Sequence, residues 1–122
     1  MDGITAYKEN TITTQPRGHL IVMLYEGAVK FLNQAIDQIE AGDDGSIADR
    51  ATYITKATNI INELNAILDV EAGGEIAADL RRLYQFMIRH LLQANIRNDT
   101  WMIHEVIDLL EDLNEGWKAV SV

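Results

Sequence analysis

The 122-residue chain contains no cysteine and only one proline, Pro16. Without cysteine it can form neither a disulfide nor a thiolate nucleophile, and a zinc site would have to use histidines and carboxylates. Basic residues are also scarce, 10 against 19 acidic ones, which gives a net charge of −9 and a pI near 4.6. That balance argues against nucleic acid and an anionic membrane surface as the main partner, because both attract clustered Lys and Arg.

Long apolar runs and targeting signals are missing as well. No run approaches the roughly 20 residues of a membrane span, so we expect no membrane insertion. The N-terminal stretch MDGITAYKENTITTQ is polar and lacks the apolar core of a signal peptide, so none is predicted. An acidic chain without cysteine fits the cytosol. What is present is 48% apolar and 24% charged residues, a balance typical of one soluble globular domain.

Apolar residues recur at helical spacing in four stretches, and no stretch alternates as a strand would. The predicted helices run from about Pro16 to Ala41, from about Ile47 to Leu68 after a cap at Ser46, from about Glu75 to Ile96, and from about Thr100 to Ala119. Short breaks between helices of similar length predict an all-α fold, an antiparallel up-down-up-down four-helix bundle over residues 16–122. Residues 1–15 show no periodicity and are predicted to form an extended N-terminal arm, with a frayed terminus as the alternative.

The breaks carry residues that end and begin helices. Gly42 suits the C-terminal cap of the first helix, and the pair Gly73 and Gly74 interrupts the chain before the third. Asn98 suits a left-handed backbone position, and Asp99 after it suits an N-cap. Between the breaks, each helix has an apolar stripe of its own, and the aromatic residues Tyr25, Tyr84 and Trp117 fall on these core stripes.

No catalytic or metal-binding motif is found around the three histidines, His19, His90 and His104. A di-metal bundle needs Glu three residues before His, and the residues there are Pro, Met and Trp. A histidine phosphotransfer domain usually has Lys and Gly three and four residues after the histidine, and none of the three histidines is followed by that pair. We therefore expect no enzyme activity, no cofactor and no metal, and keep phosphotransfer as the weakest alternative.

The helices carry more apolar residues than their core stripes need. These surplus residues lie to one side of the stripes, and they are Leu20, Met23, Tyr53, Ile60, Ile67, Leu83, Met102 and Leu109. A purely structural explanation is that each helix has a wide apolar stripe, whose outer residues pack against a second neighbouring helix. If the residues are instead uncovered, the arm, a second copy of the chain or a segment of a partner would have to cover them. If a second copy covers them, the protein would be a homo-oligomeric structural bundle, which is the alternative function.

Several motifs resemble those of the FliS flagellin-export chaperone family. The run Met23-Leu24-Tyr25-Glu26-Gly27-Ala28, seven residues after Pro16, is similar to the family's MLYDGA signature. Further matches follow in the family's order and spacing: Ile60 to Leu64, Leu68-Asp69, Gly73 to Ala77, Leu92 to Asn95 with Asn98-Asp99, and the closing segment from Leu109-Leu110 to Trp117. The chain departs from the family at Gln15, at Arg17 to His19 and at Glu26.

The resemblance implies a cytosolic, non-enzymatic chaperone that binds the disordered C-terminal segment of flagellin and prevents polymerisation before type III export. It also implies an arm that can cover the binding surface, with Tyr7 and Ile12 at the anchor positions. The flagellar export apparatus is a second candidate partner, and a homodimer is a candidate for the unloaded state. The candidate partner-binding residues are Tyr7, Ile12, Leu20, Met23, Leu24, Tyr53, Ile60, Ile67, Leu83, Met102 and Leu109.

Overall fold

A computed structural model describes the backbone of residues 3–42 and 46–120, and the side chains of residues 18–42, 48–69 and 71–119. The described part is all-α and contains no strand. Its helices are α1 Gly3–Ala41, α2 Ser46–Ala66, α3 Val70–Arg97 and α4 Thr100–Val120.

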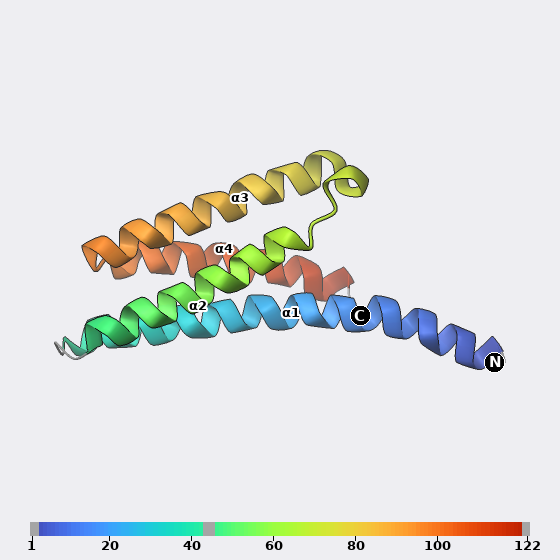
Figure 1. Cartoon of the computed structure of the whole chain (residues 1–122), viewed down its shortest axis with the longest axis horizontal. Helices are drawn as coiled ribbons and strands as arrows, with labels where there is room; N and C mark the ends of the chain where they lie inside the picture. Colours follow the sequence, from blue (N-terminus) through green and yellow to red (C-terminus); the bar gives the residue numbers. More distant parts are fainter. Residues whose placement is uncertain (1–2, 43–45, 121–122) are drawn as a thin grey trace.

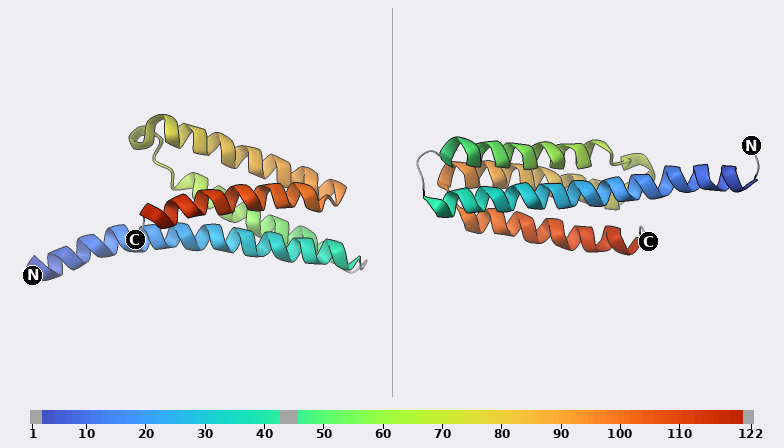
Figure 2. Two further views of the ribbon diagram at one scale, coloured as in Figure 1. Left: turned by 180° about the vertical axis from the view of Figure 1, so that it is seen from behind. Right: turned by 90° about the horizontal axis from the view of Figure 1, so that it is seen from below.

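Successive helices run in opposite directions, as the colours in Figure 1 show. Helix α1 packs against α2 and α4, and α3 packs against the same two helices. Helices α1 and α3 therefore lie diagonally across the bundle, as do α2 and α4, and Figure 2 shows the same arrangement from two other sides. The predicted antiparallel four-helix bundle is confirmed.

The prediction of an extended arm over residues 1–15 is wrong for the described backbone, because α1 is helical from Gly3. Its first part continues past the end of the bundle (Figures 1 and 2). Pro16 was expected to start the helix but lies inside it. A proline ring fixes φ near the helical value, so a helix can pass through it with the loss of one N–H hydrogen bond and some crowding of the preceding turn. Beyond Gly3, no glycine or second proline precedes Pro16 to stop the helix.

The two loops outside the glycine pair follow the predicted chemistry. Gly42 has φ of 64°, and its N–H donates to the carbonyl of Ile39 at 3.2 Å, as expected of a C-terminal cap. Asn98 is left-handed, with φ of 55°, and the Asp99 carboxylate accepts from the N–H of Met102 at 3.2 Å. The predicted cap at Ser46 concerns a side chain outside the described residues.

Helix α3 begins earlier than predicted. The Asp69 carboxylate accepts from the N–H of Ala72 at 3.0 Å and caps a short first turn. Gly74 then interrupts the helical backbone with φ of 56° and ψ of −133°. That conformation is essentially restricted to glycine, so the predicted break is present as a bend inside α3.

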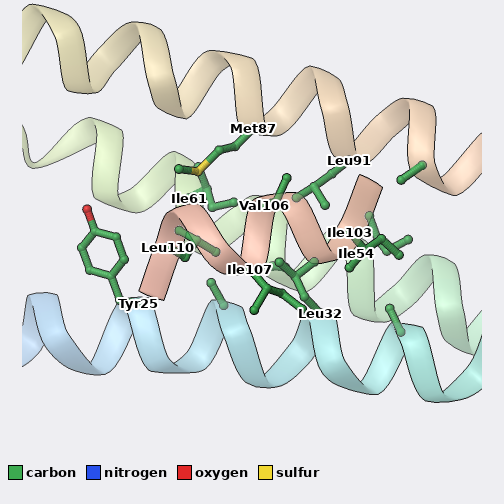
Figure 3. Packing of buried hydrophobic residues seen from close by; sticks show 14 of the residues in the cluster. Tyr25, Leu32, Ile54, Ile61, Met87, Leu91, Ile103, Val106, Ile107 and Leu110 are labelled. Atoms are coloured by element: carbon green, nitrogen blue, oxygen red, sulfur yellow. The ribbon is translucent and has the colours of Figure 1, made fainter. Parts of the chain in front are cut away.

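The core is a single apolar cluster to which all four helices contribute (Figure 3). Most of the fully buried side chains belong to the apolar stripes predicted from helical spacing, for example Leu32, Ile61, Leu91 and Leu110, whereas the fully buried Ala94 was not among them. Tyr25 and Tyr84 are also buried, although each carries a hydroxyl group. The core thus contains a polar element, and it lies beside the candidate site.

Candidate partner-binding site

The surplus residues of α1 and α2 lie along the line where these helices meet. A Cβ built on Gly27 would lie 3.3 Å from Cδ1 of Ile60, so the two backbones approach closely there. Further along, the rings of Phe31 and Tyr53 stack, with centroids 6.4 Å apart. Residues three, four or seven apart share a helix face, which places all the members of this strip together. We call it the α1–α2 strip, and its members are Leu20, Met23, Leu24, Gly27, Phe31, Tyr53, Ile60 and Ile67.

The α1–α2 strip is only partly covered by the chain. Met23 is 56% exposed, Leu20 is 49% exposed and Ile67 is 43% exposed. The other candidate residues of the strip, Tyr53 and Ile60, are half-buried and pack against the core, as does Leu24. The uncovered apolar area is therefore concentrated at the end of the strip nearest the α2–α3 connection.

A second strip follows the contact between α3 and α4. His90 Nε2 lies 3.2 Å from Glu105 Oε1, which shows which faces of the two helices meet. Leu83 lies two turns before His90 on the same face of α3, and Met102 and Leu109 flank Glu105 on α4. These three residues are half-buried and pack against the core. Because α1–α2 and α3–α4 form opposite sides of the bundle, this α3–α4 strip lies across from the first.

A cleft of about 320 Å³ lies at the end of the bundle, where the α2–α3 connection meets the last turns of α4. All four helices line it, with Ile21 from α1, Trp117 from α4, and the rest from α2, α3 and their connection. The lining is almost wholly apolar, and Asp69 is the only charged residue among the described residues that form it. In Figure 1, α3 diverges from α1 toward this end. The remaining lining residues are Leu64, Ile67, Leu68, Ala72, Gly73, Ile76, Ala77, Leu80 and Tyr84.

A polar network joins the cleft to the core. Trp117 Nε1 donates to Tyr25 Oη at 3.2 Å, and Tyr25 Oη is hydrogen-bonded in turn to Tyr84 Oη. Figure 3 shows the Tyr25 hydroxyl pointing away from α1 into the bundle. Burial removes water that would stabilise a phenolate, and it raises the pKa of Tyr25 and that of Tyr84 above the ordinary value. Both hydroxyls are therefore protonated at neutral pH.

No other chemistry is visible in the described part of the chain. Among the residues whose side chains are described, no three His, Asp or Glu residues gather as metal ligands would. Of the helices in the described ranges, none combines the length and apolarity needed to cross a membrane. What the arrangement offers is apolar contact area and a few buried hydrogen-bonding groups.

Comparison with known proteins decides the family. The family model described as "Flagellar protein FliS" matches residues 1–122. The "Flagellar secretion chaperone FliS" of Salmonella typhimurium is 44% identical, over 98% of this chain and 90% of its own length. Proteins with the same description from Bacillus subtilis and Escherichia coli are 40% and 33% identical, over 93% and 90% of this chain and 82% and 79% of their own lengths. The chain belongs to the FliS family.

Membership of the FliS family confirms the resemblance seen in the motifs. The curated relatives are named flagellar secretion chaperones, so the prediction of a chaperone rather than an enzyme is also confirmed. The family does not identify the residues that bind a partner, and these stay predictions. For Tyr7 and Ile12 the side chains lie outside the described residues.

The cleft was not predicted as a site in this FliS-family chain. Of the candidate partner-binding residues whose side chains are described, only Ile67 lines it. Tyr84 and Trp117 lie on the predicted core stripes. Tyr84 is buried and Trp117 is half-buried against the core, yet both also line the cleft. A buried tyrosine or tryptophan normally needs a hydrogen-bond partner. Tyr25, Tyr84 and Trp117 lie on the stripes of three different helices, and this pattern in the sequence could have indicated a polar network inside the bundle.

Proposed function

We propose that this chain is a cytosolic chaperone that binds the disordered C-terminal segment of flagellin and prevents its polymerisation before type III export. The observation that carries the proposal is the apolar surface that the chain itself leaves uncovered around Ile67. There the α1–α2 strip reaches the end cleft, so a bound segment would meet continuous apolar surface. Surfaces of this kind are the usual receptors for amphipathic or disordered peptides.

The strips and the cleft define a path for a wrapped segment. The α1–α2 strip leads through Ile67 to the cleft. Leu83 lies about one turn after Leu80 and directly before Tyr84, and both of these residues line the cleft. From Leu83 the α3–α4 strip continues toward Leu109 and Met102. A segment on this path would pass from one side of the bundle to the other around its end. Met23 and Met102 suit such a path, because methionine adapts to imperfectly matched surfaces.

A wrapped path also fits the energetics. Covering the exposed share of the Leu20, Met23 and Ile67 side chains is worth about 2–4 kcal/mol together, taking 1.5–3 kcal/mol for full burial of each. Ordering a disordered segment costs at least that much, typically 2–5 kcal/mol or more. One short contact is therefore insufficient, and useful affinity requires several apolar side chains along both strips and the cleft.

The direct test is titration of the chaperone with a fluorescent peptide of the flagellin C-terminal segment, read by anisotropy. A peptide from the flagellin N-terminal segment is the matched control. We expect saturable 1:1 binding of the C-terminal peptide alone. Equal binding of both peptides, or of neither, would contradict the proposal.

Light scattering on the same samples tests the alternative of a homo-oligomeric bundle. We expect the complex to contain one chaperone and one peptide, whether or not the unloaded chaperone pairs with a second copy. A stable dimer that remains intact at saturating peptide would favour the structural alternative. In the proposed function the export apparatus acts afterwards, on the loaded complex.

A further inference from the structure

The network of Tyr25, Tyr84 and Trp117 has one hydrogen-bond donor hydrogen more than it has acceptors within the network. Tyr25 and Tyr84 each carry a hydroxyl hydrogen, and the indole of Trp117 carries an N–H. The indole N–H is directed at Tyr25 Oη, and one hydroxyl hydrogen is used in the bond between the two tyrosines. For the described residues no further hydrogen bond of either hydroxyl is found, so one hydroxyl hydrogen remains unused.

The surroundings of the two tyrosines decide which of them holds the unused hydrogen. Tyr25 is fully buried and does not line the cleft, whereas Tyr84 lines it. If Tyr84 donated to Tyr25, the Tyr25 hydrogen would be enclosed in the core without an acceptor, which is costly. If Tyr25 donates to Tyr84, the Tyr84 hydrogen is free to point toward the cleft. The second arrangement leaves no enclosed, unsatisfied donor.

The cleft itself limits what can accept this hydrogen. Among the residues whose side chains the structure describes, the lining is apolar except for Asp69 and the aromatic polar groups, and none of these lining residues is basic. A carboxylate or phosphate would find no cation there and would face the charge of Asp69. A neutral acceptor is therefore favoured. The volume of about 320 Å³ is far more than the roughly 10–15 Å³ that one water needs, so the cleft has room for a side chain.

We propose that the end cleft is a subsite for one apolar side chain of the bound flagellin segment together with its neighbouring backbone carbonyl, which accepts a hydrogen bond from Tyr84 Oη. The inference rests on the proposed function for the identity of the segment. The carbonyl must be free of internal hydrogen bonds, so the residue that enters is in an extended stretch or in the last turn of a helix. Tyr84 thereby selects backbone conformation as well as apolar character.

The test uses two small probes of matched shape, so that it does not depend on flagellin. Cyclohexanone carries a neutral carbonyl acceptor, and methylenecyclohexane replaces that oxygen with CH₂. Binding of each to the full chain is followed by the shift of the Trp117 indole N–H signal in ¹H–¹⁵N spectra. The variant Trp101→Phe assigns that signal, because Trp101 is exposed and the chain has two tryptophans.

Two tyrosine variants separate hydrogen bonding from structure. Tyr84→Phe removes the proposed donor, and we expect it to weaken cyclohexanone binding roughly fivefold while leaving methylenecyclohexane unaffected. Tyr25→Phe removes a hydroxyl from the same network but leaves the Tyr84 donor, so both probes should change by the same factor. If Tyr84→Phe also changes both probes equally, or if neither probe binds in the cleft, the proposal is wrong.

A measurement on the wild-type chain covers the case in which Tyr84→Phe fails to fold. The ¹³Cζ signal of Tyr84 should shift when cyclohexanone binds, and much less when methylenecyclohexane binds. Equal shifts would mean that water already satisfies the hydroxyl, and would overturn the subsite. The flagellin peptide provides the separate test of the partner. If the peptide does not bind but the cyclohexanone effects are seen, the proposed function fails while the chemistry of the cleft is retained.

Discussion

Ile67 is the residue at which a single charge should separate partner binding from folding. It ends the α1–α2 strip, lines the cleft and is 43% exposed. Ile60 on the same strip is less suitable, because its side chain contacts the backbone of α1 near Gly27 and a charge there would disturb packing. We therefore predict that Ile67→Asp abolishes binding of the flagellin C-terminal peptide while the bundle remains folded.

The expected size of the effect follows from the exposure. The uncovered share of Ile67 contributes about 0.6–1.3 kcal/mol when a partner covers it. An aspartate in its place would lie under the partner with no cation among the described lining residues, of which Asp69 alone is charged. An uncompensated buried charge costs about 3–5 kcal/mol. The combined loss exceeds about 3 kcal/mol, which is at least a roughly 100-fold weaker affinity.

Leu92→Asp is the matched control. Leu92 is 58% exposed and two residues beyond His90, so it lies on the opposite side of α3 from the α3–α4 strip, and it does not line the cleft. Both variants should keep the helix content seen by circular dichroism, and Leu92→Asp should bind the peptide within about twofold of wild type. The reasoning is refuted if Ile67→Asp stays within threefold of wild type, or if Leu92→Asp weakens binding as much.

Three further predictions concern the arm, alkaline pH and the bend in α3. The family resemblance predicts that deleting residues 1–15 raises peptide affinity, and unchanged or weaker binding would show that the arm does not compete. Because burial raises the pKa of Tyr25 and Tyr84 above 10.0, unfolded tyrosines ionise first and stability should fall as pH rises past that value, by up to about 1.4 kcal/mol per pH unit for each. Chemical unfolding at pH 9 to 11 checks this, and an equally steep fall in Tyr84→Phe would contradict it. Gly74→Ala should destabilise the fold by about 1–3 kcal/mol, whereas Gly116→Ala, in a helix with open space around it, should stabilise it by up to about 1 kcal/mol. Thermal unfolding of both variants decides this, and a stabilising Gly74→Ala would contradict it.

The parts of the fold that were predictable are those decided by local chemistry. Asn98 and Asp99 end one helix and cap the next through their own backbone and side-chain hydrogen bonds, so neighbouring residues suffice to predict them. Burial of Leu32, Ile61 and Leu110 follows equally from spacing along a single helix. Such features need no knowledge of how the helices are arranged.

The features that were missed depend on several elements at once. The start of α1 was misplaced because a proline is compatible with either the first turn or the interior of a helix, and sequence alone does not choose between them. The cleft was missed because side chains of α1, α2, α3 and α4 form it together, beside the bend at Gly74. The spacing of apolar residues along one helix does not indicate a cavity that four helices form together.

The high net charge of this chain opposes self-association through its uncovered apolar surface. A surface such as that around Ile67 would promote self-association on a neutral protein. Here the exposed face of α4 is acidic, with Asp108, Glu111, Asp112 and Glu115, and the whole chain carries −9. Two copies that approach each other therefore repel, and the repulsion is strongest at low ionic strength. A partner segment of low net charge is not repelled in this way, so the same surface can stay accessible to it while the acidic charge opposes pairing of two chaperones.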